Sequence, residues 1–281
     1  MLEFKNFVVA FIVAVSFQFY CKAGNENMPA GARAAGMGNA AVTLTDMWSA
    51  FQNQAGLATL KGLHIGAFNQ LRYGQTELMQ NALVVALPLK DVGTFAVTFN
   101  QFGYSAYNEQ KVGIAYARSF GKTVSAAMQL NYNGTNISDN YYGNNHAVTV
   151  EAGMRIILLP ELTFGVHVYN PTRAALNNYN DERIPTTFKA GLGYQLNEKV
   201  LIAAEIEKTS ETKPVFKTGF EYQFVKKMWL RAGFSTNQNQ GYFGLGMQLK
   251  QLQINFAASF HQTLGFTPHA DLGYNFVSAN P

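Results

Sequence analysis

Period-two alternation runs through most of this chain and restricts it to a fold of two-faced strands. In "VSAAMQLNY", which begins at Val124, apolar or aromatic residues alternate with small or polar ones. Such alternation indicates a β-strand whose two faces meet different surroundings. Fourteen segments follow this pattern: 61–74, 77–89, 92–102, 109–119, 122–134, 146–158, 161–170, 184–196, 199–208, 213–225, 227–236, 241–249, 252–261 and 265–276.

Three further features favour a membrane barrel over a secreted all-β domain, the alternative that alternation alone leaves open. Most segments can cross a bilayer, since a tilted strand needs about 9–11 residues. Short connections such as "SFGKT" alternate with longer polar ones such as "GTNISDNYYGNN". Glycines crowd the polar face, and Tyr and Phe gather near segment ends. We therefore predict an all-β fold, a transmembrane antiparallel β-barrel of about 14 strands.

The composition agrees with a barrel and excludes other classes. The chain is 48% hydrophobic but only 14% charged, against about 25% charged residues in an average soluble domain. Its formal net charge is +4 and it has no run of Lys and Arg, so nucleic-acid binding is not predicted.

The first residues have the pattern of a secretory signal. Lys5 precedes an apolar run over 7–19, and Ala23 offers a small residue for cleavage. We predict a signal peptide over 1–23, a plug over 24–60 and the barrel over 61–281. Cys21, the single cysteine, is alternatively a lipid acceptor, although Tyr20 before it is bulky for that role. An even strand count places both termini in the periplasm.

Residues 24–60 lack alternation and precede the first strand. The stretch "GARAAGMGNAAV", which begins at Gly31, has too many glycines for a stable helix and is too apolar for a free linker. We predict that it lies in the lumen, where Gly31, Gly36 and Gly38 allow tight turns. Arg33, its single charge, is expected to pair with a luminal carboxylate, Glu151, Glu205 or Glu221. A short helix is expected within 45–60, with Thr45 or Asp46 as N-cap.

The stretch "GARAAGMGNAAVTLTDMWSAFQNQAGLA" (31–58) resembles the N-terminal plug motif of the FadL-like outer-membrane barrels, and more closely the PorV/PorQ-type branch common in Bacteroidetes. In that family a G-A-R-x-x-G-M-G stretch leads to an N-P-A-G-L-like turn. Here Gln54 stands where the family usually has Pro. The resemblance implies a plugged barrel in the outer membrane of a Gram-negative bacterium, with no cofactor. The plug residues it points to are Gly31, Arg33, Gly36, Gly38, Asn53 and Gly56.

Several charged residues fall on the inward face of the strands, and their signs are mixed. We interpret them as a hydrogen-bonded network that holds the plug. His261, His269 and Asp271 on the last hairpin are the alternative, a metal site, which we do not favour. No catalytic constellation is found, so no enzyme is predicted. The network residues are Glu151, Arg155, Lys189, Glu205, Glu207, Lys217, Glu221, Arg231 and Asp271.

The resemblance implies one of two functions. Some family members move hydrophobic molecules such as fatty acids across the outer membrane. Others serve protein export, as in type IX secretion, by binding the translocon and escorting cargo. The longest connection, 171–183, is mostly polar, whereas family members that transport fatty acids have long outer loops that form an apolar groove for their ligand. We therefore expect an accessory or scaffold subunit that contacts outer-membrane lipid and other envelope proteins, with hydrophobic-ligand transport as the alternative.

Overall fold

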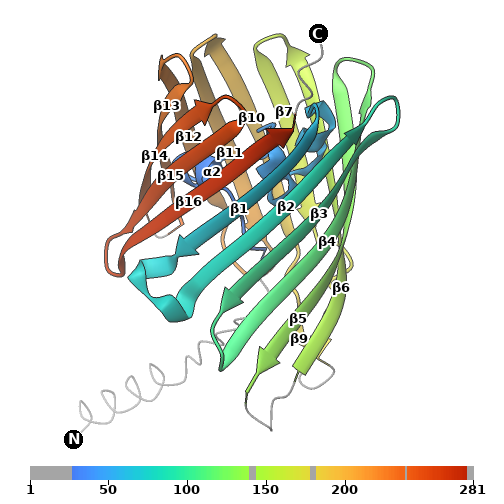
Figure 1. Cartoon of the computed structure of the whole chain (residues 1–281). Helices are drawn as coiled ribbons and strands as arrows, with labels where there is room; N and C mark the ends of the chain where they lie inside the picture. Colours follow the sequence, from blue (N-terminus) through green and yellow to red (C-terminus); the bar gives the residue numbers. More distant parts are fainter. Residues whose placement is uncertain (1–26, 139–143, 178–181, 238, 277–281) are drawn as a thin grey trace, which may run out of the picture.

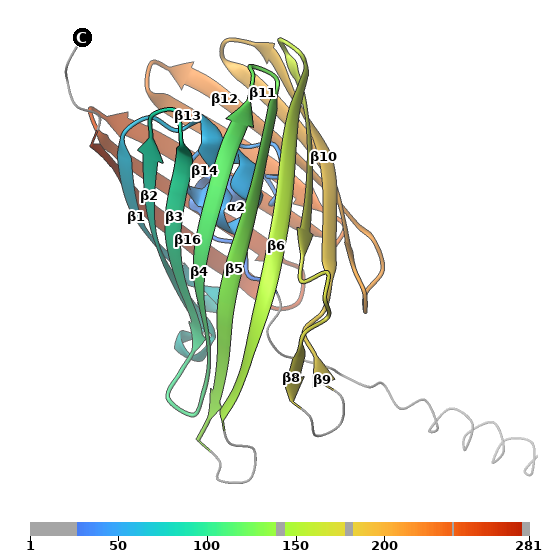
Figure 2. The same ribbon diagram turned by 90° about the vertical axis from the view of Figure 1, so that its right-hand side faces the viewer.

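The computed structural model describes residues 27–138, 144–177, 182–237 and 239–276, so the predicted signal peptide and Cys21 lie outside the described residues. Fourteen strands form a closed barrel in which each pairs with its neighbours in the chain and β1 closes on β16 (Figures 1 and 2). All of these pairs are antiparallel. The predicted fold class is confirmed.

Each predicted segment corresponds to one barrel strand, with differences of a few residues at the ends. The strands are β1 (Leu63–Leu71), β2 (Met79–Leu89), β3 (Gly93–Gly103), β4 (Tyr107–Phe120), β5 (Val124–Ile137), β6 (Asn144–Leu159), β7 (Leu162–Tyr169), β10 (Thr187–Asn197), β11 (Val200–Thr209), β12 (Val215–Val225), β13 (Met228–Ser235), β14 (Gln240–Leu249), β15 (Leu252–His261) and β16 (Gly265–Phe276).

Within the longest connection, β8 (Ala175–Asn177) and β9 (Glu182–Arg183) form a small two-stranded sheet that the sequence pattern did not reveal. Ile184 and Leu176 of this segment pack with Ala147 and Tyr169, so the connection folds onto the barrel wall. Strands this short carry too few residues for alternation to be visible.

The outward face of the barrel is apolar, as the alternation predicts. Phe243 is 70% exposed, Met128 66% and Ile114 62%. The residues that alternate with such outward residues along each strand face the barrel interior, and most of them are buried. An apolar surface of this extent belongs in a hydrocarbon environment rather than in water. Among the described residues, no helix combines the length and apolar character that a membrane crossing by a helix requires.

A charge on the apolar outward face is expected to prevent the barrel from folding into a membrane. Phe243→Lys places an ammonium on the outer face of β14, which costs about 2–4 kcal/mol near the bilayer midplane. We expect most of this variant to stay unfolded when heat-modifiable migration is measured on gels. Gln110→Lys is the control, since Gln110 is exposed on β4 close to its long connection. Equal folding of the two variants would contradict the interpretation that the apolar outward face lies in the membrane.

Short and long connections lie at opposite ends of the barrel. The short-turn end holds the connections after β2, β4, β6, β10, β12 and β14, together with the end of β16, at the top of Figure 1. The long-loop end carries β8, β9 and two 3₁₀ turns, η3 (Arg72–Gly74) and η4 (Thr76–Leu78). Strands β4, β5 and β6 extend furthest at this end (Figure 2).

The described chain begins in the half of the barrel toward the long loops. Asn27 accepts a hydrogen bond from Lys111 Nζ (3.1 Å), and Lys111 lies near the long-loop end of β4. Phe276, by contrast, ends β16 at the short-turn end. With both termini predicted in the periplasm, the segment before the barrel is expected to start at the same end as the C-terminus. Asn27 lies toward the other end. Which end faces the periplasm stays a prediction.

Candidate functional site

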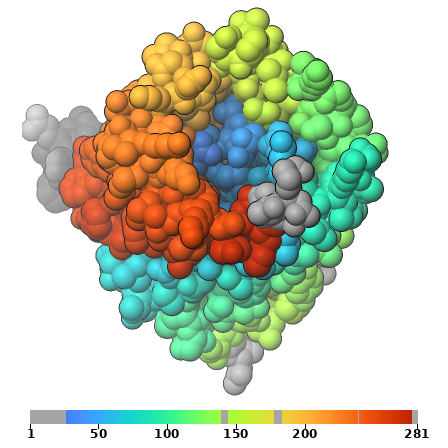
Figure 3. Space-filling view, turned by 45° about the horizontal axis from the view of Figure 1, so that its top comes forward, coloured from blue at the N-terminus to red at the C-terminus, as the bar shows by residue number. Residues whose placement is uncertain are grey.

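The described part of the predicted plug, residues 27–60, fills the barrel lumen (Figure 3, blue). Its helical elements are α2 (Ala32–Gly36), η1 (Met47–Phe51) and η2 (Gln54–Thr59). Helix α2 contacts β13, β14, β15 and β16, whereas η2 contacts β4, β5 and β6 on the other side of the lumen. Met37, Phe51 and Leu57 are fully buried.

The local structure of the plug differs from the expectation in two respects. The stretch after Gly31 forms one turn of α-helix, although the sequence analysis judged it too rich in glycine for a helix. Its glycines lie at the ends, where Gly31 (φ 107°) and Gly38 (φ 65°) adopt left-handed backbone, and alanines fill the turn. The helix expected within 45–60 is two 3₁₀ turns, η1 capped by Asp46 and η2 capped by Asn53.

Glycines of the wall match the places where the plug backbone approaches it. Gly36 and Gly244 face each other, and a Cβ on either would lie 3.0 Å from the Cα of the other. A Cβ on Gly233 would overlap the backbone of Gly38. A Cβ on Gly219 would lie 2.6 Å from the carbonyl oxygen of Met37. The small-residue face predicted from the sequence is therefore where plug and wall meet.

A first polar cluster fixes α2 to the wall. The Arg33 guanidinium donates to both oxygens of Glu221 (2.7 and 2.9 Å) and to Asp46 (3.1 Å). Arg231 donates to the same Glu221 (2.6 Å). The Ala32 N–H donates to Asp271 Oδ2 (2.6 Å). Of the three carboxylates considered for Arg33, the structure places Glu221 against it.

A second polar cluster holds the chain after α2. The N–H groups of Ala41 and Val42 both donate to Glu205 Oε2 (2.8 Å each). Lys217 Nζ lies 3.2 Å from Glu205 Oε1 and 2.7 Å from Glu207 Oε2. Lys189 Nζ lies 3.6 Å from Glu207 Oε2, so both lysines form ion pairs in this cluster.

A third cluster holds η2. Glu151 Oε2 accepts from Gln54 Nε2 (2.7 Å) and lies 2.9 Å from His167 Nε2. The Asn53 side chain donates to Val42 O (2.7 Å) and to Met154 O (3.1 Å). A Cβ on Gly56 would overlap Leu44 O, so the turn after Asn53 packs directly on the plug segment before η1. Together the three clusters anchor the plug at several points along its length.

Some predicted residues do not join these clusters. Arg155 donates to Thr43 O (3.2 Å) and Thr163 (3.4 Å), and no carboxylate pairs with it among the described residues. His261, His269 and Asp271 do not converge. His261 accepts from turn N–H groups, and His269 contacts Ser259. Within the described ranges, no group of three or more His, Cys, Asp or Glu could hold a metal ion.

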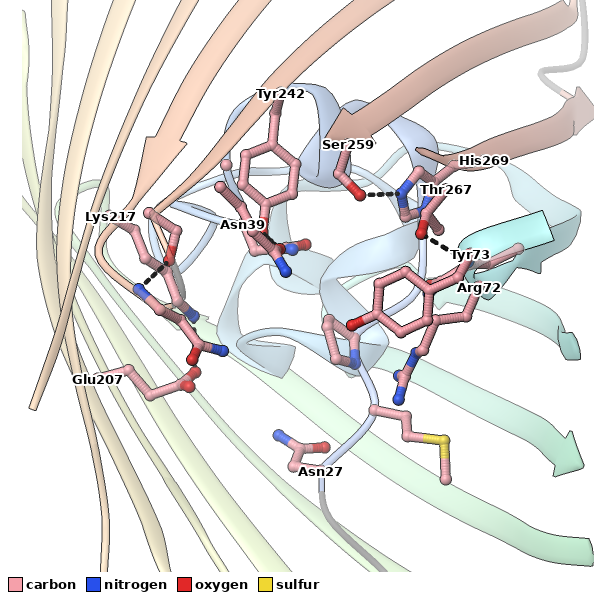
Figure 4. A pocket seen from close by; sticks show the side chains of 17 residues that line it. Asn27, Asn39, Arg72, Tyr73, Glu207, Lys217, Tyr242, Ser259, Thr267 and His269 are labelled. Carbon is pink, nitrogen blue, oxygen red and sulfur yellow. Dashed lines mark hydrogen bonds and ion pairs between the residues drawn. The ribbon is translucent and has the colours of Figure 1, made fainter. Parts of the chain in front are cut away.

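A cavity of about 290 Å³ lies between the plug and the long-loop end (Figure 4). We call it the outer cavity. Its wall is formed by the plug, by β1, by η3 and by strands β11 to β16. It shares no lining residue with three other cavities, of about 210, 520 and 280 Å³, at the short-turn end. Plug residues lie between the two sets. Its lining residues are Asn27, Met28, Pro29, Gly38, Asn39, Gln70, Arg72, Tyr73, Glu207, Lys217, Ser235, Asn237, Gln240, Tyr242, Ser259, Thr267 and His269.

Besides Gly38, two lining residues have left-handed backbone. Asn39 (φ 58°) tolerates this conformation, but Tyr73 (φ 56°) is a bulky residue for which it is strained. The Tyr73 N–H donates to Thr267 Oγ1 (2.9 Å), which ties the turn to β16. Strain of this kind persists only where surrounding contacts impose it, and it concentrates at functional sites. The residues "LRYG" do not reveal η3, because neither its backbone strain nor its position beside β16 is visible in them.

Comparison with known proteins rests on structure. No family model matches the chain, and no curated protein sequence matches it. The toluene transporter TodX of Pseudomonas putida is 12% identical, with 88% of this chain and 99% of its own covered, at a TM-score of 0.66. The toluene transporter TbuX of Ralstonia pickettii is 11% identical, with 88% and 98% covered, at 0.69. A FadL homologue of Pseudomonas aeruginosa is 12% identical, with 90% and 100% covered, at 0.61.

A closed barrel with an apolar outer face and a plug in its lumen defines a class, the plugged outer-membrane-type β-barrels. Within that class, this chain has the fold of the FadL-like barrels, shared over nearly its whole described length. At these identities the similarity establishes the fold alone. The PorV/PorQ-type branch stays a prediction.

Proposed function

We propose that this chain is a small-molecule transporter in the outer membrane of a Gram-negative bacterium, with the long loops outside and the plug as its gate. The observation that carries the proposal is the outer cavity, which opens beside exposed Asn237 at the long-loop end. The plug closes it on the side of the short-turn end. A gated transporter needs a binding cavity that opens to one side of the membrane and is separated from the other side by a movable barrier. The similar structures that are named as toluene transporters support transport over the export role expected from the sequence.

Passage through this barrel requires movement of the plug. The hydrogen-bonded ladder is continuous around all fourteen barrel strands, and its register shifts lie beside the short turns after β6, β10 and β12. The wall therefore offers no gap along the strands in this state. A solute that enters the outer cavity can leave toward the other end only if the segment 31–42 shifts, because Glu205, Glu221 and Asp271 hold it across the lumen.

Transport is tested in liposomes that contain the purified barrel. We expect entry of at least one small solute above the rate in protein-free liposomes, measured for a labelled fatty acid, for toluene and for a hydrophilic solute. Liposomes with Phe243→Lys protein, which is not expected to insert, are the matched control. Rates equal to the control for every class would contradict the proposal.

An accessory subunit of an envelope export complex is the second candidate. The continuous wall and the filled lumen favour it, because a scaffold needs no passage. Purification in mild detergent decides between the two. Stoichiometric envelope proteins that stay bound, together with no solute entry in liposomes, would replace the transport proposal with this one.

A further inference from the structure

The outer cavity is polar, although the similar structures include hydrocarbon transporters. Of the 17 residues that line it, all but Met28, Pro29 and Gly38 carry polar side chains. An apolar molecule in this space would remove water from those groups without replacing its hydrogen bonds, which is unfavourable. The lining therefore disfavours a hydrocarbon and favours a molecule with many hydrogen-bonding groups.

Among the charged residues that the structure describes around the cavity, Arg72 stands without a carboxylate partner. Lys217 and Lys189 form ion pairs with Glu205 and Glu207, so the two positive and two negative charges balance. Arg72 has no carboxylate within ion-pair distance among the described residues, and its guanidinium lies 5.1 Å from the Phe102 ring centre. Arg72 points into the cavity in Figure 4. A guanidinium in this position favours an anionic group, which it can bind with two parallel hydrogen bonds.

Hydroxyl groups suit the wall that β15 and β16 form beside the Arg72 turn. Ser259 and His269 lie together (3.4 Å), and His269 Nδ1 is buried with no hydrogen-bond partner in the described ranges. A hydroxyl can donate to or accept from either ring nitrogen. Tyr73 and Tyr242 lie on opposite sides of the cavity in Figure 4 and add aromatic surface beside these polar groups. At about 290 Å³, the cavity is at the lower limit of small-molecule sites, about 300–1,000 Å³.

We propose that the outer cavity binds a small polyhydroxylated anion of the sugar-acid class, with its carboxylate on Arg72 and its hydroxyls on the wall of Ser259 and His269. This proposal rests on the proposed transport function and assigns its substrate class. It departs from the hydrophobic ligands named for the similar structures. The strained turn at Tyr73, fixed by Thr267, holds Arg72 beside the cavity.

Calorimetry on the mature protein in lipid nanodiscs tests the assignment, with D-gluconate as the probe. We expect gluconate to bind more tightly than glucose, which lacks the charge, and than acetate, which lacks the hydroxyls. Arg72→Gln should weaken gluconate binding by at least about tenfold, because a charge-assisted hydrogen bond is lost. Arg118→Gln is the matched control, since Arg118 is exposed near the short-turn end of β4. Heat-modifiable migration shows whether each variant is folded.

The outcomes separate this proposal from that of transport. Binding of toluene without gluconate, or equal affinity for gluconate and glucose, would overturn the sugar-acid assignment whether or not Arg72→Gln folds. Gluconate affinity unchanged in folded Arg72→Gln protein would overturn the role of Arg72. Gluconate binding without entry into liposomes would leave the site in place and overturn transport. Entry of toluene without gluconate binding would do the reverse.

Discussion

Replacing Gly233 by valine is expected to displace the plug from the barrel wall and to let ions pass through the barrel. Gly233 lies on the inward face of β13, where an added Cβ would overlap the N atom of Gly38 and the carbonyl carbon of Met37. Backbone cannot move aside as a side-chain tip can, so the two further methyl groups of valine have no space. Overpacking of this kind usually costs about 1–3 kcal/mol, and here it acts on the contact between plug and wall.

Conductance in a planar bilayer measures the effect. We expect wild-type barrels to stay closed at voltages where Gly233→Val barrels show open steps, and the variant to unfold at a lower temperature on heat-modifiability gels. Gly241→Val is the matched control, because Gly241 lies on the neighbouring strand β14 with no atom within 4 Å of an added Cβ. Identical conductance and unfolding temperature in the two variants would show that plug seating does not depend on this approach.

The barrel could be predicted from the sequence because one physical condition repeats along it. Each strand meets lipid on one side and the lumen on the other, so residues such as Met128 and Gln129 alternate in polarity and burial. The glycines at 219, 233 and 244 were also informative, since only close packing in the lumen explains small residues at these inward positions. Periodicity and residue size are local properties that a single sequence displays.

The outer cavity could not be predicted, because its parts come from distant segments. Arg72 belongs to a connection that reads as an ordinary loop, and His269 lies almost two hundred residues later on β16. Register decides that these two meet, since Gln70 pairs with His269. The partner choice of Arg33 was undecided for the same reason. Three inward carboxylates had equal standing in the sequence. Only the position of α2 against β13 to β16, from which the Arg33 side chain reaches β12, selects Glu221.

Removing the charge of Glu221 is expected to have the largest effect among the network residues. Its two oxygens accept from Arg33 and Arg231 (2.6 to 2.9 Å), so Glu221→Gln leaves the buried guanidinium of Arg231 and the partly buried one of Arg33 beside one amide. Loss of one partner from a buried ion pair costs about 3–5 kcal/mol. We expect the unfolding temperature on heat-modifiability gels to fall clearly, while Glu198→Gln, in the exposed turn after β10, leaves it unchanged.

A second substitution separates the charge from the plug contact. Arg33→Met in the Glu221→Gln background removes one of the two cations that have lost the charge of Glu221, so we expect it to recover part of the lost stability. Arg33→Met alone should destabilise, because Glu221 then keeps only Arg231 and Asp46 loses its ion pair. The coupling between the two positions should therefore reach about 0.5–3 kcal/mol, the range for residues in one polar network. It should also persist in high salt, since buried pairs are weakly screened. Additive effects would mean that Glu221 stabilises the wall through Arg231 alone and that Arg33 does not hold the plug.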